Sequence, residues 1–207
     1  TIFLWLISYW EKFYKNKKIN IVELGPGNGD MLHQIILSSK KFDNFYNMCN
    51  FLIYEKSEKL IKIQKKNLKK IKVKWIKSLD RINNKPTIFV GNEFLDALPI
   101  KQYLYSNGLW HERYVQKRGN EYSFTKLKLN IKKIEKKLNL NISKKQNFLE
   151  ISFEEQRVIK KLTKIITKQG GCMLFIDYAY TGHKIFDTLQ AVNKHKKISP
   201  LKKVGNS

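Results

Sequence analysis

A chain of 207 residues with 42% hydrophobic content can bury one sizeable core, and we expect a single domain over residues 1–207. The formal net charge of +24 comes from 37 lysines and only 4 arginines, which are spread over most segments. A nucleic-acid groove usually concentrates arginine and aromatic side chains, so nucleic acid is not expected to be the main partner.

The opening apolar run, residues 2–10, is too short for a membrane span and has no basic flank before it, which argues against a signal peptide or a transmembrane helix. Cys49 and Cys172 lie far apart and have no metal-ligand spacing, and the four histidines show no regular spacing. We therefore expect no metal and a reducing compartment.

Residues 2–15 are predicted to form an amphipathic helix. Its apolar residues recur every three or four positions and should pack on a sheet. They are Phe3, Leu6, Ile7, Trp10 and Phe13.

The stretch from 19 to 40 predicts a buried strand, a tight turn and a helix start. After the acid Glu23 come Gly25, Gly27 and Gly29 at every second position, and the helix begins at Asp30. Such a unit opens a doubly wound α/β sheet, in which a ligand presses against bare backbone at the turn. An acid beside the turn would repel a phosphate but suits a ligand that carries an ammonium and a sulfonium. The alternative is a turn that only reverses the chain.

A second apolar run, residues 50–55, ends in Glu55 and precedes a lysine-rich helix to about residue 71. An acid at the tip of the second strand of a nucleotide-binding sheet accepts both ribose hydroxyls, and Glu55 is placed for that role. Alternatively, its charge only favours the dipole of the following helix.

Two further strands are predicted at 73–76 and 87–91, and the second leads directly into a polar segment. Asn92, Glu93 and Asp96 stand there among apolar residues, at the strand end where a substrate would lie. Asp96 has the alternative role of capping a turn before Pro99.

From residue 100 the apolar period changes to two. Residues 102–105 and 109–115 predict a hairpin around Asn107–Gly108, followed by a strand at 122–129. We expect substrate recognition in this antiparallel insertion, about 100–147, whose last part is a weak helix. A helix to residue 168, a strand at 172–176 and a loop-like tail with a short strand at 188–192 complete the chain.

Four motifs in order make the sequence similar to the MidA family of class I S-adenosyl-L-methionine-dependent methyltransferases. They are the segments 23–29 and 92–99, the pair Asp177–Tyr178, and the segment 188–192 followed by His195. This resemblance implies a Rossmann-like fold and S-adenosyl-L-methionine as cofactor. It also implies that the donor is bound by Glu23, Gly25, Gly27, Gly29 and Glu55.

Mitochondrial members of that family assist assembly of respiratory complex I, so the resemblance implies methylation of an arginine in a complex I subunit. Carboxylates can hold a guanidinium and accept the proton that it loses. Glu93 and Asp96 are the predicted catalytic acids and Asn92 the orienting residue, with Glu150 and Asp177 as reserves.

The resemblance further implies that this chain is a fragment that lacks both family ends. It departs from the family pattern at Asn28, Ala179 and Val204. Two other functions stay open: a non-catalytic assembly factor that grips a partner with its hairpin, and a methyltransferase for a small molecule or RNA. An Asn-Pro-Pro-Tyr motif after the fourth strand, typical of DNA and glutamine-amide methyltransferases, is replaced by residues 92–95.

Overall fold

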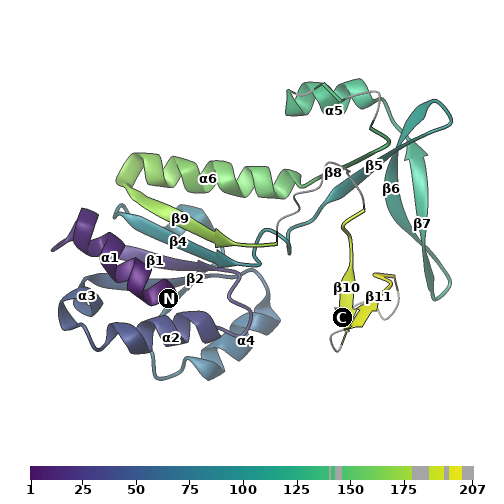
Figure 1. The fold of residues 1–207 in the computed structure, drawn as a ribbon. Helices are drawn as coiled ribbons and strands as arrows, with labels where there is room; N and C mark the ends of the chain where they lie inside the picture. Colours follow the sequence, from purple (N-terminus) through teal and green to yellow (C-terminus); the bar gives the residue numbers. More distant parts are fainter. Residues whose placement is uncertain (140, 143–145, 179–186, 194–195, 202–207) are drawn as a thin grey trace. The chain divides into compact units, whose positions relative to one another are not determined.

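A computed structural model describes all residues except 140, 143–145, 179–186, 194–195 and 202–207 (Figure 1). Ala179, His195 and Val204 therefore lie outside the described residues. The chain forms two compact units, the first made of residues 1–98 and 155–179 and the second of residues 99–154 and 180–207. Each unit is described by itself, and the expectation of one domain over the whole chain stays a prediction.

The first unit is built on a five-stranded parallel sheet in the order β3-β2-β1-β4-β9. Its strands are β1 (Ile19–Leu24), β2 (Cys49–Tyr54), β3 (Lys74–Ile76), β4 (Thr87–Asn92) and β9 (Gly171–Ile176). The chain moves outward from β1 to β3 and then returns to β4 on the other side of β1. The strand order therefore reverses between β1 and β4, the place where open α/β sheets bind ligands. The predicted doubly wound α/β fold is confirmed.

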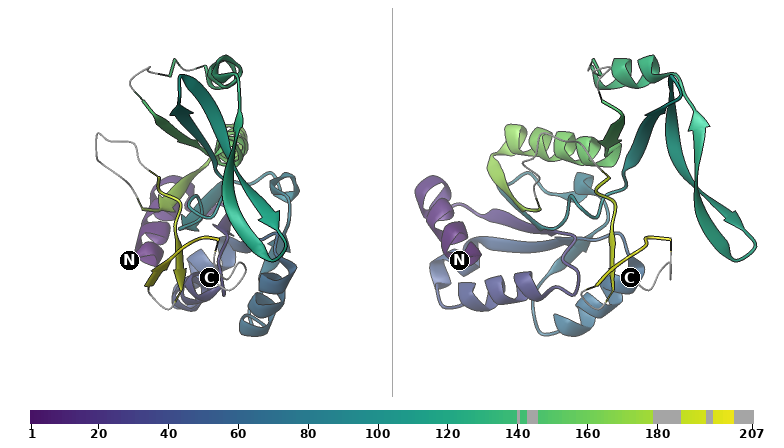
Figure 2. Two further views of the ribbon diagram at one scale, coloured as in Figure 1. Left: turned by 90° about the vertical axis from the view of Figure 1, so that its right-hand side faces the viewer. Right: turned by 45° about the vertical axis from the view of Figure 1, so that its right-hand side comes forward.

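Helices cover both faces of this sheet (Figure 2). One face carries α1 (Ile2–Tyr14), α2 (Asp30–Ser39), α3 (Asp43–Met48) and α4 (Glu58–Asn67), and the other carries α6 (Phe153–Gln169). Strand residues alternate between two apolar cores, with Ile21 packed on the α1–α2 side and Val22 on the α6 side. Of the residues predicted to dock α1, Leu6, Ile7 and Trp10 are buried, whereas Phe13 is 53% exposed.

The connection between β3 and β4 is unusually short. Consecutive parallel strands in such sheets are normally joined through an α-helix. Here residues 77–86, all of them described, contain only a single 3₁₀ turn, η1 (Leu79–Arg81). The α6 face of the sheet next to β3 therefore has no crossover helix of its own.

The second unit contains an antiparallel sheet in the order β7-β6-β5-β8. Its strands β5 (Lys101–Ser106), β6 (Leu109–Arg118) and β7 (Glu121–Lys128) confirm the predicted hairpins. Helix α5 (Ile131–Leu138) follows, then β8 (Phe148–Ile151), which pairs with β5 and was not predicted. Strands β10 (Ala191–Asn193) and β11 (Lys196–Ile198) form a separate hairpin, which overlaps the predicted strand 188–192 only in part.

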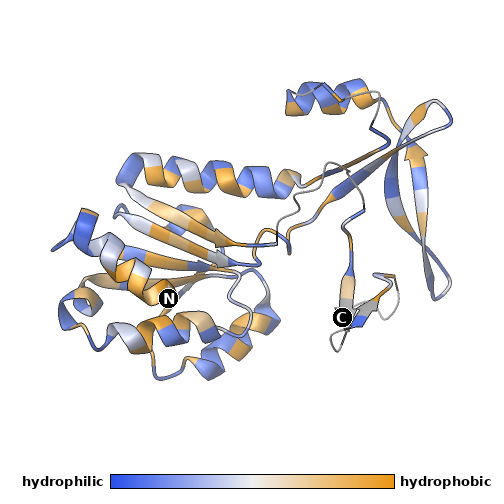
Figure 3. Ribbon diagram, in the orientation of Figure 1, coloured by the Kyte–Doolittle hydropathy of each residue, from blue (hydrophilic) through white to orange (hydrophobic). Residues whose placement is uncertain are grey.

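Figure 3 shows how hydropathy follows this arrangement in the first unit, where the parallel strands are mostly apolar and the helices alternate between polar and apolar residues. Strand β1 is buried at every position. Such continuous burial is typical of a parallel sheet with both faces covered.

Substitution of Gly171 tests whether the close approach of β9 to β4 requires a residue without a Cβ. Its φ is +119°, and a Cβ added there would lie 1.9 Å from the carbonyl oxygen of Thr87. Because that oxygen belongs to backbone, Gly171→Ala should lower the free energy of unfolding by more than about 2 kcal/mol. Urea titration of both proteins measures this change. Gly27→Ala, with a φ of +57° but open space around the added Cβ, should cost clearly less.

Candidate active site

The glycine turn leaves β1 at the carboxyl edge of the sheet and leads into α2. Gly25 donates its N–H to the carbonyl of Tyr54 at 3.0 Å, which holds the start of the turn against the end of β2. Gly25, Gly27 and Gly29 all have left-handed backbone angles, with φ of +59°, +57° and +89°. Such angles favour residues without a Cβ. The turn conformation itself therefore explains why glycine stands at every second position.

The three glycines differ in what surrounds them. A Cβ on Gly25 would lie 2.8 Å from the ring of Phe94, and one on Gly29 would lie 3.2 Å from Leu68. Among the described residues, nothing comes within 4 Å of a Cβ placed on Gly27. Gly25 and Gly29 are thus needed for packing, while Gly27 is the glycine at which a ligand can approach the backbone.

Glu23 lies beneath this turn and is 3% exposed. Its carboxylate accepts a 3.1 Å hydrogen bond from the N–H of Leu32 in the first turn of α2. Because the N-cap of α2 is Gly29, which has no side chain, Glu23 supplies from β1 the cap that the helix lacks. Burial raises the pKa of Glu23 to about 7; the bond from Leu32 opposes this shift, and the nearby Asp30 adds to it.

Glu55 lies one strand away, directly after β2, and is 8% exposed. One carboxylate oxygen accepts the N–H groups of Lys56 and Ser57, both at 2.8 Å. The other accepts a longer bond, 3.3 Å, from the amide of Gln64. Glu55 thus anchors the chain before α4, and Oε2 is the oxygen that carries one long hydrogen bond.

Gln64 connects the glycine turn to this acid. Its side chain is completely buried, and its amide also donates to the carbonyl of Gly27 at 2.8 Å and accepts from the indole of Trp75 at 3.0 Å. The sequence analysis did not single out Gln64. The sequence did contain a signal for a buried role of Gln64. It lies three positions after Ile61 and four before Leu68, which places it on the same buried face of the helix.

The polar segment after β4 begins at the same edge of the sheet. Asn92 is the last residue of β4, is exposed, and pairs in register with Ile176 of β9. Glu93 follows with a φ of +52°, and its N–H donates to the carbonyl of Ile176 at 2.8 Å. A left-handed glutamate is uncommon, costs about 1–3 kcal/mol, and is typical of functional sites.

Asp177, at the end of β9, holds the turn that contains Asp96. Its carboxylate accepts the N–H of Leu95 at 3.3 Å and that of Asp96 at 3.5 Å. The turn is therefore capped by Asp177, and the side chain of Asp96 stays exposed. Partial burial and the neighbouring Asp177 carboxylate both raise the pKa of Asp96.

Phe94 brings the two turns together. Its ring packs on Gly25, lies edge-on to Tyr54 at 6.4 Å between centroids, and stacks on Phe175 at 6.5 Å. Gly91 makes room for this packing, because a Cβ there would lie 2.9 Å from Phe175. The predicted donor and acceptor residues of the first unit are thus joined through one aromatic contact.

Glu150, a reserve catalytic residue, belongs to a different network in the second unit. It accepts a 2.6 Å hydrogen bond from the buried Gln102 and a bond from Thr188. Gln102 also donates to Asp187, which pairs with Arg113. Burial alone would raise the pKa of Asp187, but the bonds from Arg113 and Gln102 outweigh it and lower that pKa. The motif at 188 is therefore tied to β5, β6 and β8.

Comparison with known proteins identifies the family. A family model described as "Putative S-adenosyl-L-methionine-dependent methyltransferase" matches residues 1–207. The chain belongs to this methyltransferase family. S-adenosyl-L-methionine is accordingly the cofactor of the family, and the resemblance drawn from the motifs is confirmed.

Curated relatives of this methyltransferase family member carry the name protein arginine methyltransferase NDUFAF7, mitochondrial, or its homologue. The Caenorhabditis elegans protein is 29% identical over 89% of this chain and 48% of its own length. The human protein is 23% identical over 93% of this chain and 49% of its own length. The chain thus spans about half the length of the curated relatives that it matches.

Two solved structures from Burkholderia thailandensis share the fold. One is an uncharacterized protein with a TM-score of 0.72 and 17% identity, which covers 95% of this chain and 54% of its own. The other was solved bound to S-adenosyl-homocysteine, with a TM-score of 0.65 and 16% identity over 86% of this chain and 46% of its own. The predicted class I methyltransferase fold is confirmed.

The residues at the glycine turn fit the family's cofactor. Gly27 leaves open space beside the backbone, and Glu55 directly follows the neighbouring strand.

Within the described residues, no helix is both long and apolar enough to cross a membrane.

The raised pKa of Glu23 predicts a pH dependence of stability. A carboxyl whose pKa rises from 4.5 to about 7 on folding contributes stability that is fully present below pH 4.5 and is lost as the pH rises through 7. Its contribution to the free energy of unfolding should therefore fall by about 3 kcal/mol between pH 4.5 and 8.

Glu23→Gln keeps an acceptor for the Leu32 N–H but cannot ionise. Urea titrations at pH 5 and pH 8 should show a smaller fall for this variant than for the wild type. Glu121→Gln, an exposed position in β7, should leave the wild-type difference unchanged. Equal pH dependence in wild type and Glu23→Gln would contradict the assignment.

Proposed function

We propose that this chain carries the donor site and the catalytic acids of an S-adenosyl-L-methionine-dependent methyltransferase that acts on a protein arginine. The observation that carries the proposal is the open backbone at Gly27, between Glu55 on one side and the Phe94-linked turn of Glu93 and Asp96 on the other. Bound there, the cofactor would supply a methyl group on a positively charged sulfonium.

On the donor side, the open space at Gly27 gives the nucleoside or its amino-acid part access to backbone. Oε2 of Glu55, with one 3.3 Å bond from Gln64, is the oxygen with capacity for a ribose hydroxyl. Glu23 is buried under the turn, and in its ionised form it would act on the cofactor's ammonium through the turn.

On the acceptor side, Glu93 and Asp96 would position a guanidinium. A guanidinium stays protonated at neutral pH and is a poor nucleophile, so it must be held in line with the methyl group and lose a proton. The guanidinium nitrogen forms a bond to the methyl carbon while the carbon–sulfur bond breaks, and the nitrogen's proton passes to a carboxylate. The pKa of Asp96 is raised, which favours this carboxylate as a proton acceptor, and Asn92 would orient the substrate.

The second unit is the candidate for protein recognition. It presents an antiparallel sheet whose strands carry exposed aromatic side chains, including Tyr105, Tyr114 and Phe124. Exposed aromatic residues are enriched where proteins bind each other. We assign substrate recognition to the predicted insertion of about residues 100–147.

Relatives that are named mitochondrial protein arginine methyltransferases support a protein substrate. By the family resemblance, the substrate is a complex I subunit. The proposed location is the mitochondrial matrix in a eukaryote or the cytoplasm in a bacterium, and nucleic acid and membranes are not proposed partners.

Gly27→Val tests the donor site. Two methyl groups would enter the space that the ligand needs, so affinity for S-adenosyl-homocysteine should fall at least tenfold in isothermal titration of the full chain. The matched control is Gly108→Val, a hairpin glycine that is also left-handed, with a φ of +75° and open surroundings. Unchanged affinity in Gly27→Val, with its circular dichroism spectrum intact, would refute the proposed donor site.

Glu93→Gln tests catalysis separately from binding. Loss of a carboxylate that would hold the guanidinium and could accept its proton should lower methyl transfer to the protein fraction of a lysate by about a hundredfold or more, while S-adenosyl-homocysteine affinity stays within twofold. Transfer of labelled methyl groups measures this rate, and Glu121→Gln is the control. Label that disappears after ribonuclease instead of protease would indicate an RNA substrate. Complex I assembly that is intact in Glu93→Gln would favour the non-catalytic assembly factor.

A further inference from the structure

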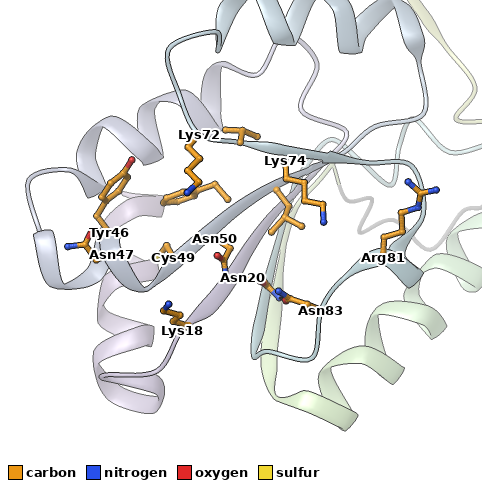
Figure 4. A pocket seen from close by; sticks show the side chains of 13 residues that line it. Lys18, Asn20, Tyr46, Asn47, Cys49, Asn50, Lys72, Lys74, Arg81 and Asn83 are labelled. Atoms are coloured by element: carbon orange, nitrogen blue, oxygen red, sulfur yellow. Dashed lines mark hydrogen bonds between the residues drawn. The ribbon is translucent and has the colours of Figure 1, made fainter.

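The first unit has a hollow at the end of the sheet opposite the candidate active site. Its volume is about 520 Å³, and it is lined by residues at or just before the beginnings of β1, β2 and β3, by the end of α3 and by the segment before β4 (Figure 4). Volumes of 300–1,000 Å³ are typical of small-molecule sites. Arg81 of the 3₁₀ turn η1 and Asn83 after it border the hollow where a crossover helix would otherwise connect β3 to β4.

Charge is the first unusual property of this hollow. Lys18, Lys72, Lys74 and Arg81 line it, and none of the described lining residues is acidic. Within the described part of the chain, these four cations have no ion-pair partner. Figure 4 shows Lys72 and Lys74 on one side of the Asn20–Asn50 pair and Lys18 on another. Such a concentration of cations in a concave site favours an anionic ligand.

The second unusual property is a row of three linked amides, of which Asn20 is buried, Asn50 is half-buried and Asn83 is exposed. Strands of a parallel sheet with two covered faces are normally apolar throughout, yet Asn20 is completely buried in β1 and is paired in register with Asn50 of β2. Burying an amide costs free energy unless it is hydrogen-bonded. Asn20 accordingly donates to Asn83 at 2.8 Å and to Thr87 at 3.0 Å, and accepts from Asn50 at 3.2 Å.

These bonds orient the outer amides. Asn83 uses its oxygen to accept from Asn20, so its NH₂ group is turned away from Asn20. Asn50 donates to Asn20 and to the carbonyl of Ile19 at 3.3 Å. The hollow thus combines amide groups held in place with flexible ammonium groups. Together these groups suit the oxygens of a phosphate, which accept hydrogen bonds and carry charge.

We propose that this hollow binds a compact phosphate-bearing anion, with its phosphates held between Lys72, Lys74 and the Asn83 amide. A small ligand is favoured over a polymer because the hollow has the volume of a small-molecule site and because its cations are mainly lysines, which bind phosphate as point charges. The site is separate from the glycine turn, since it lies at the amino ends of the strands whose carboxyl ends form the donor site.

The test uses inorganic pyrophosphate, ADP and ATP as probes, with isothermal titration of the full chain at moderate salt. At least one probe should bind the wild type with micromolar affinity. Lys72→Glu/Lys74→Glu should weaken that binding at least tenfold, because two attractive charges become repulsive. The matched control is Lys40→Glu/Lys41→Glu, at two exposed positions after α2, which gives the same net charge.

Three further measurements separate this site from other causes. Gly27→Val and saturating S-adenosyl-homocysteine should both leave probe binding within twofold, so failure of the proposed methyltransferase function would not affect this result. Lys72→Gln/Lys74→Gln should weaken binding less than the glutamate pair, and its circular dichroism spectrum checks folding.

Equal loss of binding in the two glutamate pairs would overturn the proposal, because it would mean non-specific attraction to lysines. Absence of binding for all three probes at millimolar concentration would overturn it as well. A twelve-nucleotide single-stranded RNA that binds through Lys72 and Lys74, while the small probes do not bind, would replace the small anion by a polymer.

Discussion

The position of the glycine turn depends on one buried side-chain amide. Gln64 of α4 donates to the carbonyl of Gly27 and to the carboxylate of Glu55, and it accepts from the indole of Trp75. A buried amide with an unmet hydrogen bond costs about 1–3 kcal/mol. Moving any of the three partners away from Gln64 would therefore destabilise the fold by leaving a buried polar group unpaired. Helix α4, the end of β2, strand β3 and the glycine turn are therefore linked by one set of hydrogen bonds beside the open backbone at Gly27.

Much of this frame could be predicted from local patterns. Apolar runs that end in an acid identified β1 and β2, and alternate glycines after Glu23 identified the turn. The parallel strands then bring these acids to one edge without any further information. The polar residues after β4 were predicted for the same reason, and they lie at that edge too.

Contacts between distant segments could not be predicted in this way. Nothing near Gly25 in the sequence indicates that its missing Cβ accommodates Phe94, or that Asp177 holds the turn around Asp96. Helix periodicity placed Phe13 on the sheet, but the helix presents it outward beside Tyr9. Strand β8 is short, and its assignment depends on pairing with β5, which one sequence segment does not reveal.

Strand β1 carries chemistry of opposite sign at its two ends. Asn20 lines the hollow with its lysines and shares the strand face of Val22, whereas Glu23 is directed toward α2. Three residues of extended chain separate them by about 10 Å, and an odd spacing places them on opposite faces. An anion at one end and a sulfonium at the other would thus be kept on opposite faces of the sheet, and deletion of one residue between Asn20 and Glu23 would place both side chains on the same face.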